Sequence, residues 1–355
     1  MIRLRSLAQA ASVLTHPLSA EDVLSLFDPV FSHRQLRGVV TSVVRENANS
    51  TTIHFRPGRG WKAHLAGQWA RIGVELNGVR HWRSYSLSAA AGQDPAITVT
   101  DVGSVSGTLV RETKPGDILF LAPPQGDFTL PEHPRPLLML TAGSGITPVM
   151  SMIRTLVPRR PDADVVLVHS ARSSADSLFL EELRELADQF KNLRVVEHFT
   201  AESGRLDLAD AAGLDDLCPD WRERAAYACG PTGFLDDAEK LWAESTGTQG
   251  GCQDLVIERF STEFVGGDGE EGGLVTFEAS DREVEAPGDE TLLDVGEDAG
   301  ILMPSGCRMG ICHSCMVPLR AGKVRDLRTG EVHGDPGQLI QTCVSAAAGP
   351  VNLDL

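Results

Sequence analysis

The spacing of four cysteines near the end of the sequence constrains this chain most. Four residues separate Cys307 from Cys312, two separate Cys312 from Cys315, and 27 lie between Cys315 and Cys343. In this spacing four thiolates can bind the two irons of a [2Fe–2S] cluster. Gly310, inside the tight trio, lets backbone N–H groups approach the sulfur atoms. The sequence therefore predicts a metal-binding domain with these four ligands.

A structural zinc site is the alternative, because four thiolates also satisfy tetrahedral zinc. Zinc modules usually pair their ligands as two short-spaced couples, whereas here one distant cysteine completes a tight trio. The spacing therefore favours iron–sulfur over zinc. A chain of this length needs no disulfide staples, so clustered cysteines also indicate a reducing compartment, and we expect a cytoplasmic location.

The charge balance argues against two classes of partner. The 355 residues include 32 Lys plus Arg and 49 Asp plus Glu, for a formal net charge of -17. Such a chain repels nucleic acids and anionic lipid headgroups. No segment approaches the roughly 18 to 20 apolar residues that a membrane span needs. The mildly apolar N-terminus is interrupted by Gln9 and His16, so we expect a soluble protein without a secretory signal.

The acidic charge is concentrated at the C-terminal end. Residues 265–355 hold 16 acidic and 6 basic side chains, which is -10 of the total of -17. Simple solubility explains such a bias. An acidic docking face for a positively charged redox partner explains it equally well, because charge of this kind steers encounter.

Changes of pattern along the chain predict several domains. Short β-type runs separated by Gly and Pro turns indicate an antiparallel β-barrel, and strands alternating with helical segments then indicate an α/β domain with a parallel sheet. A glycine- and acid-rich stretch reads as a linker. The expected divisions are a helical extension at 1–35, the barrel at 36–132, the α/β domain at 133–264, the linker at 265–273 and the cysteine-containing domain at 274–355.

The barrel carries a candidate phosphate and flavin motif. Arg83-Ser-Tyr-Ser86 follows a predicted strand, and it combines a guanidinium that can hold phosphate, an aromatic ring that can cover a flavin face and a hydroxyl that can donate. The small residues and hydroxyls of Gly103-Ser-Val-Ser106 leave backbone N–H groups open to a pyrophosphate. The alternatives are a surface strand in which Tyr85 packs on a neighbour, and an ordinary turn.

The α/β block carries two candidate nucleotide motifs. Thr141-Ala-Gly-Ser-Gly-Ile-Thr-Pro148 leads from a buried strand into a helix, which brings glycines and a helix N-terminus to a phosphate. Ala228-Cys-Gly-Pro231 ends another strand and opens another helix. Arg172, just after another strand, offers a guanidinium that could hold a phosphate. The alternatives are a tight turn, a small buried Cys229 and a solvated Arg172.

Together these motifs resemble the ferredoxin reductase superfamily, and Ser305-Gly-Cys-Arg-Met-Gly-Ile-Cys-His-Ser-Cys315 resembles the cluster loop of plant-type ferredoxins. The resemblance implies a flavin barrel, an α/β nucleotide domain and a β-grasp ferredoxin domain of α+β class. It implies that Arg83 and Ser106 contact phosphate, Tyr85 stacks on the flavin, Ser86 faces N5 and Cys229 helps place the nicotinamide. It also implies that Arg172 pairs with the 2′-phosphate of NADPH and so selects that nucleotide. Phe260, which closes the reductase part, would cover the flavin or its adenine, with Glu258 as a nearby polar contact; packing of Phe260 in the core is the alternative. The expected cofactor-binding residues are Arg83, Ser84, Tyr85, Ser86, Gly103, Ser106, Gly143, Gly145, Thr147, Pro148, Arg172, Gly230, Pro231 and Phe260, with Ser86 and Cys229 at the hydride-transfer site.

The domain order implies a self-contained electron-transfer chain. NADPH, or else NADH, delivers a hydride to FAD, which is favoured over FMN, and a [2Fe–2S] cluster passes single electrons to an external acceptor. The segment His16–Pro29, and the stretch from Arg56–Trp61 through His81–Ser86, look similar to actinobacterial reductases that serve membrane acyl-CoA desaturases. We therefore expect a monomeric oxidoreductase that docks at a desaturase and is peripheral to the membrane only then.

Two other readings remain open. Reductases of ring-hydroxylating dioxygenases, alkane hydroxylases and cytochrome P450 share the same parts, so the acceptor could belong to any of these classes. A non-enzymatic iron–sulfur redox sensor or a zinc interaction module is the second reading. The intact motifs at 83–86, 143–148 and 229–231 argue against it.

Overall fold

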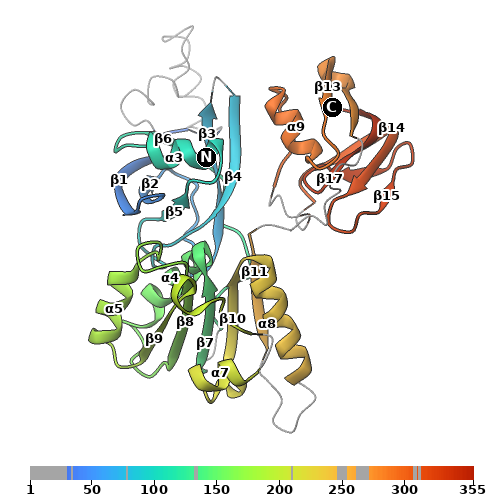
Figure 1. Ribbon diagram of the computed structural model, residues 1–355. Coiled ribbons are helices and arrows are strands. Elements are labelled where there is room, and N and C mark those ends of the chain that lie inside the picture. The colour runs from blue at the N-terminus through green and yellow to red at the C-terminus, as the bar shows by residue number, and fades with distance from the viewer. Residues whose placement is uncertain are drawn as a thin grey trace, which may run out of the picture. The chain divides into compact units, whose positions relative to one another are not determined.

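The computed structural model describes most of the chain (Figure 1), and the expected helical extension and most of the expected linker lie outside the described residues. Most of the first two sheets belongs to one compact unit and the third sheet to another, and each is described on its own. In the described ranges, no helix is both long and apolar enough to span a bilayer. The described residues are 30–32, 35–76, 79–131, 135–208, 211–245, 254–260, 272–306, 310 and 313–355.

The first sheet is the expected antiparallel barrel. Its strand order is β4-β3-β6-β1-β2-β5, and an antiparallel bridge from Leu87, just past β4, to Ile97 of β5 joins the two edge strands. Residues such as Ile53 and Phe55 on β2 are fully buried and fill its interior. The helix α3 (Ser104–Arg111) connects β5 and β6. The strands are β1 (Arg37–Asn47), β2 (Ser50–Pro57), β3 (Trp69–Leu76), β4 (Val79–Ser86), β5 (Ala96–Thr100) and β6 (Ile118–Leu121).

The second sheet is parallel and carries helices on both faces. Its order is β11-β10-β7-β8-β9, so the chain leaves β7 toward β8 on one side and later returns to β10 on the other. The residues 137–140 of β7 are all fully buried, as expected for a strand covered on both sides. The point between β7 and β10 is a topological switch point, where open α/β sheets bind ligands. The strands are β7 (Leu137–Ala142), β8 (Val165–Ala171), β9 (Leu193–Phe199), β10 (Ala225–Gly230) and β11 (Leu255–Arg259).

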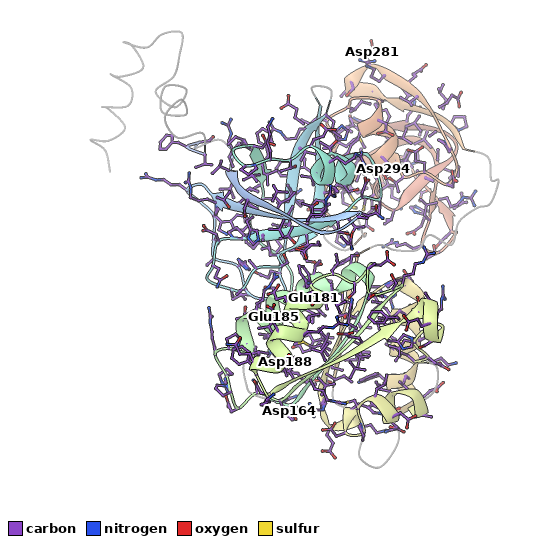
Figure 2. The ribbon with its side chains drawn as sticks, turned by 60° about the vertical axis from the view of Figure 1, so that its left-hand side comes forward. Asp164, Glu181, Glu185, Asp188, Asp281 and Asp294 are labelled. Carbon is purple, nitrogen blue, oxygen red and sulfur yellow. The ribbon has the colours of Figure 1, made fainter. Side chains whose placement is uncertain are left out.

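Two separate cores flank this second sheet. Met139, Leu167 and Tyr227 pack against α4 (Ile146–Leu156) and α5 (Leu180–Gln189), whereas Leu140 and Ala228 pack on the other face. Figure 2 labels Glu181, Glu185 and Asp188 on α5, and all three are exposed. The α5 helix therefore buries one side and presents acidic side chains on the other. The remaining helices are α6 (Thr200–Ser203), α7 (Ala211–Leu217) and α8 (Thr232–Ser245), with short 3-10 turns at Gly143–Gly145 and Trp221–Glu223.

The third sheet is mixed and packs against one helix, which confirms the expected α+β ferredoxin-type domain. Its order is β13-β12-β17-β14-β15, with β12 parallel to β17 and β16 paired to β14. The hydroxyl of Thr291 caps α9 (Leu292–Asp298) by accepting from the N–H of Asp294. The strands are β12 (Gly273–Phe277), β13 (Arg282–Ala286), β14 (Met316–Asp326), β15 (Val332–His333), β16 (Leu339–Gln341) and β17 (Ser345–Leu353), with a 3-10 turn at Glu278–Ser280.

Candidate functional site

The two nucleotide motifs meet at the switch point of the second sheet. Cys229 on β10 is the register partner of Thr141 on β7, although 87 residues separate them in the sequence. A Cβ at Gly145 would lie 2.1 Å from the carbonyl oxygen of Cys229, so the absence of a side chain is what allows this approach. Gly230 ends β10 in the same crevice, and the exposed Pro231 leads into α8.

The turn after β7 fits a nucleotide phosphate. Gly143 has a φ of +55°, and nothing lies within 4 Å of the position that a Cβ would occupy there. The hydroxyl of Thr147 donates to the carbonyl of Ser144 at 2.9 Å, which closes the turn. Pro148 sits in the first turn of α4, where its missing N–H costs little. The open backbone and the helix N-terminus form a suitable anion site.

A buried polar cluster lies where the barrel meets this crevice. The hydroxyl of Ser86, at the end of β4, donates to Oε2 of Glu258 on β11 at 3.5 Å. Cys229 is fully buried, and burial together with the nearby charge of Glu258 raises the pKa of its thiol. Burial also raises the pKa of Glu258 to about 8, and the hydrogen bond from Ser86 opposes that shift. Both shifts favour the protonated, uncharged forms of Cys229 and Glu258.

Glu258 predicts a pH dependence of stability. A carboxyl whose pKa is raised from 4.5 in the unfolded state to about 8 in the folded state binds more protons when the chain is folded. Its contribution to the free energy of unfolding is therefore complete below pH 4.5 and is lost as pH rises through 8. Since one pKa unit corresponds to about 1.4 kcal/mol, we expect the free energy of unfolding of wild type to fall by several kcal/mol relative to Glu258→Gln between pH 5 and 9. Chemical denaturation at these pH values measures the difference. The exposed Glu181→Gln should show none, and a constant difference for Glu258→Gln would contradict the assignment.

The flavin motif lies on a strand rather than after one. We expected Arg83–Ser86 to follow a strand, but these residues form the second half of β4. Side chains alternate along a strand, so Ser84 and Ser86 share one face while Arg83 and Tyr85 share the other. The buried hydroxyl of Ser84 has no partner among the described residues. An orphaned hydroxyl beside this motif fits a site built to receive a polar ligand.

The second flavin segment forms the start of α3. Gly103 precedes the helix, and the space that a Cβ would take there is open. The Ser106 hydroxyl accepts from the N–H of Val102 at 3.0 Å and donates to the carbonyl of Gly103 at 3.2 Å. This side chain therefore closes the turn, and the backbone N–H groups are what the segment offers to a pyrophosphate.

Two of the four expected cluster ligands lie side by side. The Sγ atoms of Cys315 and Cys343 are 3.2 Å apart, and both residues are buried. Hydrogen bonding between the two side chains lowers the pKa of Cys315 to about 6, against the effect of burial. Adjacent thiols with one of them poised for ionisation fit thiolate ligation. Cys307 and Cys312 lie outside the described residues.

Two expected residues lie farther out on the surface. Arg172 follows the last residue of β8 and is exposed. Phe260 follows β11 and is 39% exposed. Neither position tests the role expected of the residue. The carboxyl of Glu258 was expected only as a nearby polar contact, and no sequence signal indicated its burial against Ser86 and Cys229.

Comparison with known proteins identifies relatives along the whole chain. Residues 139–240 match the oxidoreductase NAD-binding domain family, and residues 275–348 match the 2Fe-2S iron-sulfur cluster binding domain family. An NADPH oxidoreductase of Mycobacterium tuberculosis is 45% identical over 359 residues, covering 99% of this chain and 92% of the relative. The ferredoxin reductase component of a 3-ketosteroid-9-alpha-monooxygenase from Mycolicibacterium smegmatis is 31% identical and covers 84% of this chain and 89% of its own.

A solved structure shows the same fold. Phthalate dioxygenase reductase superposes with a TM-score of 0.68 at 22% identity, covering 91% of this chain and 98% of the other. That protein is described as a modular structure for electron transfer from pyridine nucleotides to [2Fe–2S]. The similarity extends over all three sheets described above.

Proposed function

Because this chain belongs to the ferredoxin–NADP reductase superfamily, as an NAD(P)H-dependent oxidoreductase with a C-terminal [2Fe–2S] domain, we propose that it is the monomeric reductase of a separate oxygenase or desaturase. FAD, NAD(P)H and the [2Fe–2S] cluster are its cofactors. The observation that carries the proposal is the 45% identity over 99% of the chain to an NADPH oxidoreductase. Relatives named as reductase components of monooxygenases support an external redox partner.

The barrel residues and the residues of the second sheet would bind different cofactors. Bound FAD supplies the conversion between a hydride and single electrons. On the barrel side, Arg83 and the N–H groups after Gly103 would hold the FAD phosphates, Tyr85 would stack on the flavin ring, and the Ser86 hydroxyl would donate toward N5. On the nucleotide side, the turn 143–148 would hold a phosphate of the nucleotide, and Cys229–Pro231 would place its nicotinamide. Phe260 would cover the flavin or its adenine. The protein thus supplies orientation and exclusion of water rather than acid–base chemistry.

The acceptor that we propose is a membrane acyl-CoA desaturase, with the reductase cytoplasmic and peripheral only while docked. This choice is supported by the similarity to desaturase reductases of His16–Pro29 and of the stretch from Arg56–Trp61 through His81–Ser86. The alternatives are a ring-hydroxylating dioxygenase, an alkane hydroxylase or a cytochrome P450.

Two experiments test the function. An anaerobic visible spectrum of the purified protein should show flavin and iron–sulfur bands that NADPH bleaches, whereas a colourless zinc protein or a coloured one inert to both nucleotides would overturn the reductase assignment. Reconstitution with purified desaturase in lipid nanodiscs should then give substrate oxidation coupled to NADPH consumption. Coupling only with an oxygenase component would move the acceptor to that class.

Arg172 predicts the choice of nucleotide. A charge-assisted hydrogen bond is worth about 1.5 to 3 kcal/mol, so losing the contact with a 2′-phosphate should lower the NADPH to NADH preference roughly 10- to 100-fold. The measurement is kcat/KM for each nucleotide with Arg172→Ala. Arg160→Ala is the matched control, since that exposed arginine pairs only with Asp162 among the contacts of the described residues. An unchanged preference in Arg172→Ala would show that the residue does not read the phosphate.

A further inference from the structure

The helix α4 links the two halves of the candidate site. It begins at the Gly143–Gly145 turn, and its flank contacts the segment Ser88–Ala91, which follows the flavin motif by two residues. The hydroxyl of Ser151 donates to the carbonyl of Ala89 at 2.6 Å, and Thr155 Oγ1 accepts from the N–H of Ala91 at 2.8 Å. The guanidinium of Arg154 donates from Nη1 to the carbonyl of Ser88 at 2.6 Å.

Of these three α4 residues, Arg154 also contacts the start of α5. Its Nε and Nη2 bind the two carboxylate oxygens of Glu182 at 2.8 Å and 2.5 Å, which is a bidentate pair. Its guanidinium carbon lies 4.8 Å from the ring centroid of Phe179. The Arg154 side chain is only 19% exposed, so these contacts are partly shielded from water. One side chain therefore joins the barrel segment that follows β4, the start of α5 and the loop before it.

The loop that Arg154 holds runs from Arg172 to Phe179. Phe179 is buried with a φ of +57°, a conformation that a bulky residue keeps only when its surroundings fix it. Within the loop, the hydroxyl of Ser173 donates to Asp176 at 2.6 Å. These contacts make the position of Arg172 depend on how both ends of the loop are anchored.

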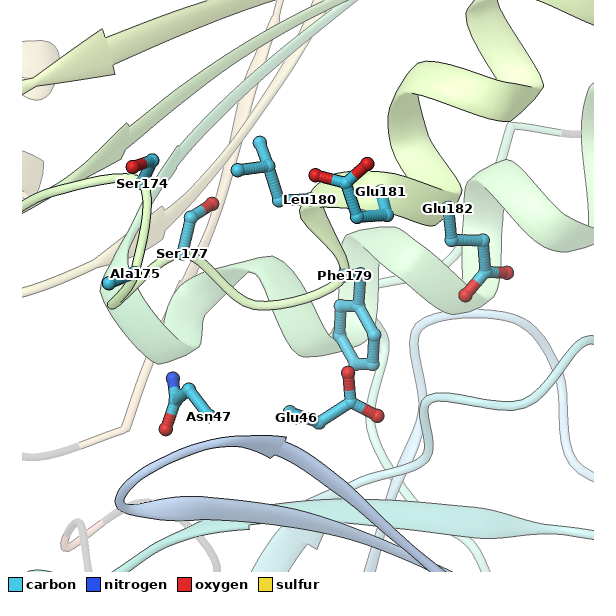
Figure 3. A pocket seen from close by; sticks show the side chains of 9 residues that line it. All are labelled: Glu46, Asn47, Ser174, Ala175, Ser177, Phe179, Leu180, Glu181 and Glu182. Atoms are coloured by element: carbon cyan, nitrogen blue, oxygen red, sulfur yellow. The ribbon is translucent and has the colours of Figure 1, made fainter.

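A cavity separates much of this loop from the β1–β2 hairpin of the barrel, so each polar contact between them matters more for the position of the loop. Figure 3 shows Glu46 and Asn47 of β1 facing the loop and the start of α5 across a cavity of about 290 Å³. Across it, Asn47 Nδ2 donates to the carbonyl of Asp176 at 3.1 Å. Among the contacts of the described residues, Arg154 adds a further polar connection, from Ser88 of the barrel segment to Glu182 at the start of α5.

We propose that Arg154 is a positioning residue for hydride transfer, which fixes the nucleotide-reading loop relative to the strand that carries the flavin motif. This inference rests on the proposed roles of Ser86 and Arg172. Hydride transfer needs near-contact geometry, and a displacement of about 1 Å can lower a rate by roughly 100-fold. Without Arg154, the Ser88 carbonyl loses this donor and the Glu182 carboxylate loses its bidentate cation.

The test uses the FAD-loaded full chain with Arg154→Met and Arg154→Lys. Stopped-flow flavin reduction gives the limiting rate and the apparent nucleotide Kd, and hydrogen exchange without nucleotide follows peptides covering 87–91 and 173–182. For Arg154→Met we expect a limiting rate lowered roughly 10- to 100-fold, with faster exchange in both peptides. Arg154→Lys keeps the charge but loses the planar fork, so it should restore only part of the rate. Arg160→Met should match wild type.

Three results would overturn the proposal. These are an unchanged limiting rate at saturating NADPH despite faster exchange, faster exchange in only one of the two peptides, and full rescue by lysine. If Arg154→Met does not fold, Glu182→Gln breaks the same pair from the other side and is judged by the same criteria. A wild-type protein that fails to oxidise NADPH would contradict the proposed function. Hydrogen exchange in the two peptides would still test whether Arg154 fixes the loop relative to the barrel segment.

Discussion

Cys343→Ser is expected to abolish electron delivery to cytochrome c while NADPH still reduces ferricyanide. Cys343 is buried beside Cys315, and a serine hydroxyl does not replace a thiolate as an iron ligand. Cytochrome c reduction should therefore fall by roughly 100-fold or more as the cluster is lost. Ferricyanide accepts electrons from the flavin, so its reduction should stay within about twofold, because the two sites belong to separate sheets. Cys312→Ser, outside the described residues, should behave in the same way.

Cys218→Ser is the matched control for that variant. Cys218 follows α7, is fully buried in a core that covers the second sheet, and donates to Asp220 at 3.4 Å, a bond that a hydroxyl can also make. It should retain both reductions and the iron content of wild type. Equal loss of both reductions in Cys343→Ser would instead assign a structural role to the cluster, and intact cytochrome c reduction would remove Cys343 from the ligand set. Iron analysis and visible spectra accompany both rates.

The features that were predicted best from the sequence are those that depend on residues close together in the chain. A buried strand, a glycine turn and an apolar helix follow one another in 137–156, so the local pattern determines the local structure. The barrel and the parallel sheet were predictable for the same reason. That Arg83–Ser86 lie on a strand was not predictable in this way. These polar residues show no alternation of apolar and polar side chains, and they belong to β4 through its pairing with β3.

The features that sequence reasoning missed depend on contacts between distant segments. Nothing near Glu258 indicates that Ser86, 172 residues earlier, will lie beside it, and its raised pKa follows from that burial. Arg154 reads as an ordinary helical arginine until the fold brings Ser88 and Glu182 to its two sides. Ser106 shows a different limit, since its residue type suits a phosphate contact but its hydroxyl is engaged in closing the turn.

Gly145→Ala is expected to remove most NADPH-dependent flavin reduction. The new Cβ would lie 2.1 Å from the carbonyl oxygen and 2.4 Å from the carbonyl carbon of Cys229, and 2.7 Å from the nitrogen of Gly230. These are backbone atoms of β10, which cannot rotate away as a side chain could, so the turn after β7 must move. Overpacking of this kind costs about 1 to 3 kcal/mol. A shift of about 1 Å at the crevice lowers the rate of flavin reduction roughly 100-fold.

The control must separate lost geometry from lost stability. Gly330 has a φ of +76° with open space at its Cβ position, so Gly330→Ala should cost about 1 to 2 kcal/mol through backbone strain alone. It lies in the third sheet region, and its flavin reduction by NADPH should equal that of wild type. Stopped-flow reduction and the thermal midpoint of both variants decide the matter. If Gly145→Ala is merely less stable and still reduces flavin at the wild-type rate, hydride transfer does not require the close approach of β7 and β10.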